Sequence, residues 1–291
     1  MLEIYESSEK GNEIMIIAKA RRMTKRQLQE KVQRRLSQYG KRILFPFRRR
    51  CKRTQLVFIM GYGRSGTTML LNSFERDMRI EVLGENDPRI AENYVLVCEN
   101  IAPALEACKA EVLVMKPILN SFDAEVLLND FRDSKLIWMI RDYKDVVASA
   151  SDRFGPTVAD YMRQHVRFGE GDNWLARGLP RESLKELNKL NTETFTDHDW
   201  MALVWWAVNK TICIHDLCKS ERLLLVKYEE LVRNVGAHMH RAYEFIGLPY
   251  AQRPGAYMHA ASVGKGADTK LDETVNQMCL DLSLEIDSLC E

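Results

Sequence analysis

The most informative segment of the sequence for the fold is Phe58-Ile-Met-Gly-Tyr-Gly-Arg-Ser-Gly-Thr-Thr68. It starts in an apolar run and ends where helical spacing begins, so a strand, a glycine-rich turn and a helix are predicted in succession. Gly61, Gly63 and Gly66 allow the backbone to turn with positive φ and to approach a ligand closely. The helix that follows offers N–H groups and a partial positive charge at its first turn. The sequence therefore predicts an anion-binding loop, with phosphate as its simplest ligand.

This loop differs from the Walker A pattern at one informative position. Gly61 and Gly66 have the Walker spacing, but Thr67 stands where that pattern has lysine. The Walker lysine reaches the β- and γ-phosphates of a nucleoside triphosphate, so its absence argues against triphosphate chemistry. The cation lies earlier, at Arg64. A glycine turn without a ligand is the alternative. The residues predicted to bind an anion here are Gly63, Arg64, Ser65, Gly66, Thr67 and Thr68.

Apolar runs alternate with helical spacing along the rest of the chain. The predicted strands are residues 55–60, 80–83, 111–115, 135–140 and 222–226. The predicted helices are residues 67–75, 88–98, 124–131, 144–153 and about 199–219, with a final docked helix from Leu271 onward. Near-continuous apolar strands that alternate with helices indicate a parallel sheet covered on both faces. We expect an α/β, three-layer, P-loop-like fold with a central parallel sheet flanked by helices.

Composition and charge distribution divide the chain. With 291 residues, 46% hydrophobic and 29% charged, it has globular composition, which excludes disordered and collagen-like classes. Residues 19–53 carry 15 basic residues and one acidic residue, whereas residues from 54 onward carry 26 basic and 36 acidic ones. We therefore expect a basic N-terminal extension over residues 1–54 and a single domain over residues 55–291. Residues 154–200 are polar and long for a connection, which predicts an acceptor-binding lid.

The extension has two interpretations. A helix over residues 25–39 would place Leu28, Val32 and Leu36 on one face and end at Gly40. It either makes peripheral contact with an anionic surface such as a membrane, or it packs its apolar edge on the rest of the protein. We expect no nucleic-acid partner, and the sequence leaves the oligomeric state open.

Cysteine usage and the absence of targeting patterns favour a cytoplasmic location. The seven cysteines are odd in number and scattered, which is typical of free thiols in a reducing compartment. No apolar run approaches the ~20 residues that a membrane span needs. The first residues are acidic and lack the order of a signal peptide.

A second anion site is predicted after the strand at 135–140. Arg141 follows this strand directly, and ligands of open α/β sheets bind at the carboxyl ends of the strands. Ser149 lies eight residues later, about two helical turns, so it can face the same way as Arg141. An arginine and a hydroxyl together suit a second phosphate.

With these motifs in place, the sequence resembles the sulfotransferases that use 3′-phosphoadenosine 5′-phosphosulfate (PAPS). The Gly-Arg-Ser-Gly-Thr-Thr loop is similar to their 5′-phosphosulfate site, and Arg141 with Ser149 is similar to their 3′-phosphate site. The segments Leu-Leu-Leu-Val-Lys-Tyr-Glu-Glu-Leu over 223–231 and Ile-Gly-Leu-Pro-Tyr over 246–250 also match the family. The resemblance covers residues from about 54 to 250 and says nothing about the acceptor.

The resemblance implies roles for further residues. PAPS would be the co-substrate and 3′-phosphoadenosine 5′-phosphate (PAP) the product, with no metal required. Arg64 would neutralise charge on the bridging oxygen as the sulfur–oxygen bond breaks. Tyr228 would lie near the adenine or, alternatively, be a buried residue at a strand end. Lys265 and Gly266 belong to a loop that is similar to the one closing over the 3′-phosphate in the family.

This chain lacks the histidine that serves as general base in the cytosolic members of the family. Small-molecule members carry Lys-Thr-His after the matching strand, whereas this chain has Lys116-Pro117-Ile118. Other members use a glutamate in a Gly-Glu pair about twenty residues after the loop, and Gly84-Glu85 fits that position. Glu85 is therefore the predicted base and Lys116 the group that stabilises the sulfuryl oxygens, with Asp87 and Asp123 as reserve bases.

The acceptor class is the least determined part of the prediction. A small metabolite is expected, and a glycan or a lipid is the main variant. Glu170, Asp172 and Trp174 in the predicted lid could bind a cationic or polyhydroxylated acceptor or simply form a solvated loop. The histidines of that segment are His165 and His198. Two other functions compete with sulfuryl transfer: a P-loop small-molecule kinase and a non-enzymatic nucleotide-binding adaptor.

Overall fold

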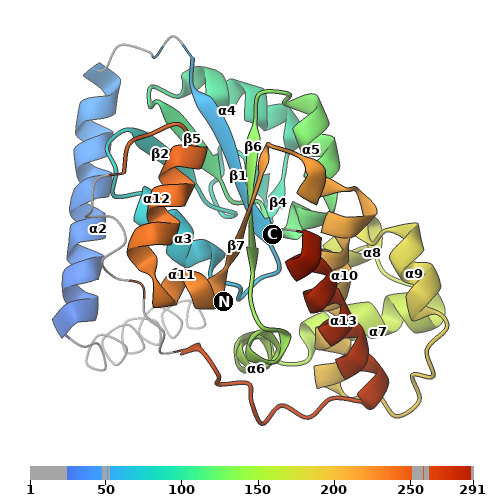
Figure 1. Ribbon diagram of the computed structural model, residues 1–291. Helices are drawn as coiled ribbons and strands as arrows, with labels where there is room; N and C mark the ends of the chain where they lie inside the picture. Colours follow the sequence, from blue (N-terminus) through green and yellow to red (C-terminus); the bar gives the residue numbers. More distant parts are fainter. Residues whose placement is uncertain (1–24, 48–50, 52, 251–257, 259–261, 290–291) are drawn as a thin grey trace, which may run out of the picture. The chain divides into compact units, whose positions relative to one another are not determined.

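The computed structural model describes residues 25–47, 51, 53–250, 258 and 262–289 (Figure 1). It comprises two compact units, residues 1–47 and residues 48–291. In the first unit, α2 spans Lys25–Leu44 and a 3₁₀ turn, η1, follows at Phe45–Phe47. The prediction that this helix ends at Gly40 is wrong. An interior glycine costs only about 1 kcal/mol relative to alanine, so the helix continues until the sequence nears Pro46. The side chain of Leu28 lies outside the described residues.

The second unit is built on a five-stranded sheet in the order β2-β5-β1-β6-β7. All neighbouring strands are parallel, which confirms the predicted sheet. The strands are β1 (Gln55–Gly61), β2 (Ile80–Leu83), β5 (Val112–Met115), β6 (Lys135–Ile140) and β7 (Leu223–Lys227). β5 and β1 are buried along almost their whole length because helices cover both faces of the sheet.

One face of the sheet packs on α3 (Thr67–Phe74), α11 (Tyr228–Arg233) and α12 (Val235–Phe245). Val57 and Ile59 of β1 enter this core together with Leu70 and Phe74 of α3. The alternate residues of the strands face the other layer, as the two-residue period of a strand requires.

That other layer centres on α10 (Asp197–Ile214) and includes α5 (Ala124–Asp130) (Figure 1). Trp138 of β6 donates its indole N–H to Asn209 of α10 at 2.9 Å, and Phe58 packs edge-on against Phe131. A 3₁₀ turn, η4, follows α10 at Leu217–Lys219. The last helix, α13 (Glu273–Leu289), docks on α10, with Lys210 and Glu285 paired at 2.8 Å.

The predicted helix at 88–98 is wrong. The chain there forms a short antiparallel hairpin of β3 (Ala91–Glu92) and β4 (Val95–Leu96). Asn93 and Tyr94 at its tip have φ of 49° and 67°, as a tight turn between antiparallel strands requires, and a helix cannot pass through two such residues. Helical structure begins afterwards, with the 3₁₀ turn η2 (Cys98–Asn100) and then α4 (Ile101–Ala107).

The segment predicted as a lid is mostly helical. α6 (Tyr143–Phe154) is followed by α7 (Thr157–Phe168), α8 (Trp174–Gly178) and α9 (Arg181–Leu187). α7 buries Ala159 and Met162, and it lies against α10. Trp174 stacks on Phe122 of the 3₁₀ turn η3 (Ile118–Asp123), with ring centroids 5.8 Å apart. This packing anchors the segment next to the carboxyl end of β5.

Candidate active site

The loop between β1 and α3 has a conformation that requires glycine at position 66. Gly66 has φ of 89° and caps α3 without a side-chain hydrogen bond. A Cβ at this position would lie 2.5 Å from Cδ2 of Tyr228, so no larger residue fits without a shift. Ser121 accepts the Gly61 N–H at 3.2 Å and donates to the Gly61 carbonyl at 2.9 Å, which fixes the start of the loop. The loop is therefore a rigid feature of the sheet edge.

The loop contains polar groups suited to an anion. Ser65 is fully buried, and its hydroxyl has no hydrogen-bond partner among the described residues. A buried hydroxyl without a partner is costly, and a bound phosphate oxygen would satisfy it. The N–H groups at the first turn of α3 lack a side-chain cap from Gly66, which adds donors of the kind that bind phosphate.

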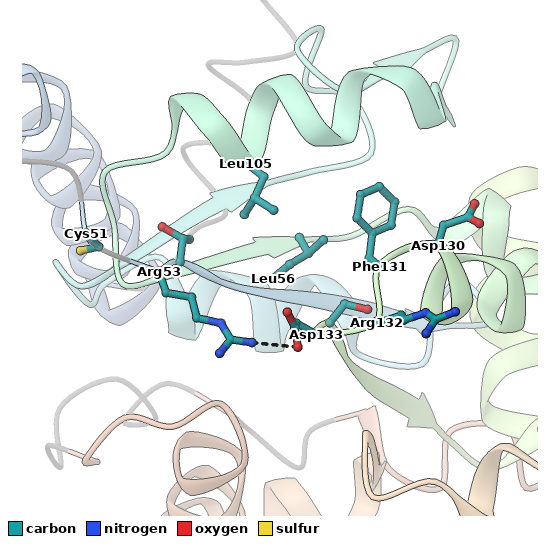
Figure 2. A pocket seen from close by; sticks show the side chains of 10 residues that line it. Cys51, Arg53, Leu56, Leu105, Asp130, Phe131, Arg132 and Asp133 are labelled. Atoms are coloured by element: carbon teal, nitrogen blue, oxygen red, sulfur yellow. Dashed lines mark ion pairs between the residues drawn. The ribbon is translucent and has the colours of Figure 1, made fainter.

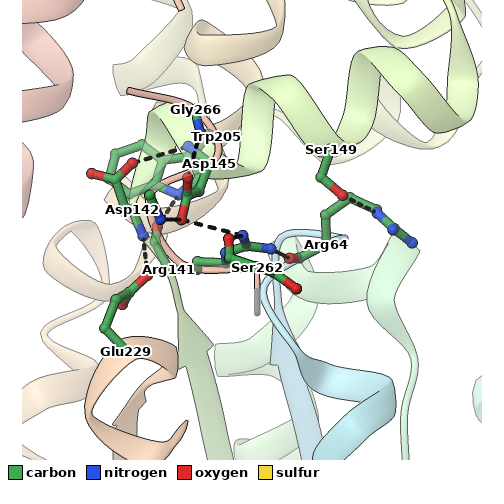
Figure 3. A network of polar contacts seen from close by, with 10 residues as sticks. Arg64, Arg141, Asp142, Asp145, Ser149, Trp205, Glu229, Ser262 and Gly266 are labelled. Carbon is green, nitrogen blue, oxygen red and sulfur yellow. Dashed lines mark hydrogen bonds and ion pairs between the residues drawn. The ribbon is translucent and has the colours of Figure 1, made fainter. Parts of the chain in front are cut away.

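Arg64 connects the loop to the neighbouring strand. It is a non-glycine residue with φ of 73°, and its Nε donates to the Ser149 hydroxyl at 2.9 Å (Figure 3). Its backbone carbonyl accepts a hydrogen bond from Nη1 of Arg141 at 3.1 Å. Burial, and then the charges of Arg153 and Arg141, lower the pKa of the Arg64 guanidinium. These three arginines make this edge a region of concentrated positive charge.

Arg141 is buried at the carboxyl end of β6. Its guanidinium donates to the Ser262 carbonyl at 2.5 Å, pairs with Asp145 at 3.2 Å and lies 4.6 Å from the ring centroid of Tyr228. Its Nε has no partner among the described residues. Trp205 of α10 donates to the Arg141 carbonyl at 3.0 Å, so both the backbone and the side chain are held (Figure 3).

The C-terminal loop is fastened beside Arg141 by Asp145. This carboxylate lies in the first turn of α6 (Tyr143–Phe154), is 2% exposed and accepts the N–H groups of Gly264 at 2.8 Å and Gly266 at 2.6 Å. A Cβ at Gly266 would lie 2.2 Å from the Lys144 carbonyl, so glycine is needed for this close approach. Lys265, between the two bonded glycines, is exposed. Sequence reasoning missed Asp145, although its i, i+4 spacing from Arg141 was a usable signal.

A second cluster joins β2, β5 and α3. Leu83 at the end of β2 pairs in register with Met115 of β5, so the residues that follow the two strands meet at the same edge. Lys116 Nζ contacts Glu85 Oε2 at 2.5 Å and Thr68 Oγ1 at 3.1 Å. The Lys116 side chain is 5% exposed and the Glu85 side chain 32%. A buried ammonium, an accessible carboxylate and the loop helix are thus in direct contact.

The remaining predicted residues lie in other surroundings. Asp87 is bound twice by Arg89; burial opposes ionisation, but the hydrogen bonds and charge of Arg89 lower the pKa of Asp87. Asp123 accepts from Asn120 at 2.9 Å. His165 lies on α7, and His198 lies in the first turn of α10. None of these four residues has a contact with the Lys116–Glu85 pair among the interactions of the described residues.

Two cavities lie at the opposite edge of the sheet. A cavity of about 390 Å³ is lined by Thr54 before β1 and by Phe131, Asp133 and Ser134 before β6 (Figure 2). Another of about 540 Å³ shares this edge and is lined by Glu111 and Arg222. Both lie at the amino ends of the strands, away from the loop and the two clusters.

The described part of the chain was searched for membrane-spanning helices and for metal-binding groups. Its helices include none with the length and apolar character needed to cross a bilayer. Within the same residues, no group of three or more histidine, cysteine, aspartate or glutamate side chains is arranged to hold a metal ion.

Comparison with known proteins identifies the family. No curated protein sequence matches the chain. Similar solved structures include the sulfotransferase domain of the Synechococcus olefin synthase (14% identity, 82% of this chain, 98% of that chain, TM-score 0.47). A sulfotransferase from Alicyclobacillus acidocaldarius has 14% identity, covers 83% of this chain and 95% of its own, and has a TM-score of 0.47. A mouse sulfotransferase complexed with PAP has 16% identity, 77% and 70% coverage, and a TM-score of 0.41. The sulfotransferase domain family model matches residues 54–279, and the chain therefore belongs to the sulfotransferase family.

Proposed function

We propose that the domain transfers a sulfuryl group from PAPS to a hydroxyl or amine of an acceptor by in-line displacement, with Glu85 as general base. The observation that carries this proposal is the position of Lys116, whose ammonium contacts both Thr68 at the loop helix and the Glu85 carboxylate. A cation and a carboxylate beside an anion-binding loop are the groups that sulfuryl transfer to a protonated acceptor needs.

The loop would hold the 5′-phosphosulfate. Ser65 supplies a buried hydroxyl in need of a partner, and the first turn of α3, with Thr67 and Thr68, supplies further donors. Gly63 offers room for close approach, since a Cβ there would meet only Ile118 at 4.0 Å. Arg64 would lie against the charge that develops as the sulfur–oxygen bond breaks.

The 3′-phosphate would be bound at the end of β6. Arg141 Nε lacks a partner among the described residues, and the loop carrying Lys265 and Gly266 is fastened next to it. Ser149 accepts from Arg64 at 2.9 Å, so residues assigned to the two anionic groups are within reach of each other. Tyr228 is buried beneath Arg141 and against Gly66, which supports a role in shaping the nucleotide site.

The proposed reaction is a displacement at the sulfur atom of PAPS. The acceptor oxygen or nitrogen forms a bond to sulfur while the bond from sulfur to the 5′-phosphate oxygen breaks, and the electron pair leaves with PAP. Glu85 takes the proton of the acceptor. Lys116, which neutralises Glu85 in the structure, would turn toward the sulfuryl oxygens and leave the carboxylate free to act.

The acceptor is proposed to be a small metabolite, with a glycan or a lipid as the variant, and to bind beneath residues 154–200. Glu170 and Asp172 are exposed there, whereas Trp174 is stacked on Phe122. The two acids are therefore better candidates for acceptor contact than the tryptophan.

Ligand-dependent thermal stability tests the proposal. PAP is expected to raise the unfolding midpoint, because a ligand that binds only the folded state stabilises it by mass action. Adenosine 5′-phosphate should raise the midpoint less, since it lacks the 3′-phosphate. A shift with ATP and magnesium but none with PAP would contradict the proposal and favour a kinase. Stabilisation by PAP without PAP release from PAPS across a broad acceptor panel would favour a nucleotide-binding adaptor.

A further inference from the structure

Helix α2 carries an apolar stripe of exposed side chains along one face. Val32, Leu36, Tyr39 and Ile43 recur at intervals of four, three and four residues, which places them on one face of the helix. Each is exposed, from 48% for Val32 to 64% for Leu36 and Ile43. Phe47, after the helix, is 85% exposed. Exposed apolar side chains gathered in this way mark a surface that binds a partner.

The charge of the sequence that contains the stripe indicates which partner it binds. Residues 19–53 carry 15 basic residues and one acidic residue, Glu30. A nucleic acid would use the positive charge but would leave the aliphatic stripe in water. An anionic bilayer uses both, because acyl chains accept the apolar face while lipid headgroups attract lysine and arginine.

We propose that α2 is an interfacial helix that binds the full chain to the surface of anionic membranes, with Leu36, Tyr39 and Ile43 inserted at the boundary between headgroups and acyl chains. The proposal concerns residues 25–47 alone and does not depend on the activity of the sulfotransferase domain.

Vesicle co-sedimentation of the full chain tests the proposal. The protein is expected to bind vesicles of phosphatidylcholine with phosphatidylglycerol, to bind pure phosphatidylcholine weakly, and to be released by raised salt. Leu36→Glu combined with Ile43→Glu should lower the partition coefficient by at least roughly tenfold, since it removes two apolar side chains that would insert into the bilayer and adds two negative charges.

A matched variant separates the stripe from net charge. Val126 on α5 and Leu284 on α13 are 54% and 59% exposed, so Val126→Glu with Leu284→Glu adds the same charge at similar exposure. This control should bind within about twofold of the unaltered chain. Equal binding of both double variants, or binding of the α2 variant like the unaltered chain, would overturn the proposal.

A second variant reports insertion directly. Tyr39→Trp places a fluorophore in the stripe. The difference between its emission and that of the unaltered chain, which has five tryptophans, should shift to the blue on anionic vesicles and be quenched by brominated acyl chains. No shift on vesicles that do bind would overturn the proposed insertion. Retention on heparin together with no vesicle binding would assign the extension to a soluble polyanion instead. A lower thermal midpoint of the α2 variant, with unchanged vesicle binding, would mean that the stripe packs on the protein itself.

Discussion

The buried carboxylate of Asp145 accepts the backbone N–H of Gly266 at 2.6 Å, across 121 residues of sequence. The same carboxylate pairs with Arg141 at 3.2 Å. One side chain thus positions both the arginine and the C-terminal loop that we propose bind the 3′-phosphate, and the positions of these two parts therefore depend on each other.

Asp145→Asn should weaken PAP binding by about tenfold, because an amide cannot accept both loop N–H groups and pair with Arg141 at once. Binding of adenosine 5′-phosphate should change little, and hydrogen exchange should increase over residues 262–266. Asp142→Asn is the matched control, since it also removes a negative charge but keeps an acceptor for the Asp145 N–H. If charge alone mattered, both variants would bind PAP at least as tightly as the unaltered chain. That result would show that Asp145 does not position Arg141 and the C-terminal loop for PAP binding.

Arg141→Ala should weaken binding of PAP by roughly 10- to 100-fold, the range expected when a charge-assisted hydrogen bond to a phosphate is lost. Adenosine 5′-phosphate has no 3′-phosphate and should lose far less. Calorimetric titration of both ligands measures the difference. An equal loss for the two nucleotides would show that Arg141 supports the fold of the site and does not bind the 3′-phosphate.

Glu85→Gln should leave PAP affinity intact and reduce turnover by roughly 100-fold or more, the usual scale for loss of a general base. The substitution keeps the shape of the side chain next to Lys116 but removes its ability to take a proton. Asp87→Asn is the comparison. Asp87 is hydrogen-bonded to Arg89, so this substitution should leave turnover nearly unchanged. If the Glu85 variant released PAP at an unchanged rate, another residue would have to be the general base.

Gly66→Ala should lower stability by at least about 2 kcal/mol, since φ of 89° disfavours any side chain and the new Cβ would overlap the Tyr228 ring. PAP binding should fall with it. Gly63→Ala is the matched control for stability, because its Cβ would meet only Ile118 at 4.0 Å. Similar melting of the two variants would contradict this account of the loop.

The Asp77–Arg79 pair predicts a pH dependence of stability. Burial raises the pKa of Asp77, but hydrogen bonds and the charge of Arg79 outweigh it and hold this pKa below its usual value. A lowered folded-state pKa stabilises the protein above the unfolded-state value of about 3.9 and stops doing so as pH falls through the folded value. Asp77→Asn should therefore destabilise at pH 7 by about 1–3 kcal/mol and have a shrinking effect in acid, as urea unfolding can measure. A pH-independent difference would contradict this assignment.

Local patterns in the sequence predicted the sheet and the loop well. All five strands of the parallel sheet were predicted within a residue or two at their ends, because each is a short apolar run, and the central strands β5, β1 and β6 are buried along almost their whole length. The hairpin at 91–96 was not predicted. Its turn depends on positive φ at Asn93 and Tyr94. Asparagine adopts that geometry more readily than most residues, but tyrosine rarely does so without support. Part of the support is the Asn120 side chain, which accepts the Leu96 N–H at 2.8 Å from 24 residues away.

Residue type and local spacing were sufficient to predict the glycine-rich loop, the arginine after β6 and the strand ends that Glu85 and Lys116 follow. The ion pair of Lys116 with Glu85, the hydrogen bond from Arg64 to Ser149 and the hydrogen bond from Gly266 to Asp145 depend on how the whole chain packs. These contacts join residues 31, 85 and 121 positions apart. They depend on the order in which strands pair and on the path of the chain between them. A hydrogen bond acts over about 3 Å, so residues distant in sequence interact only after packing has placed them side by side.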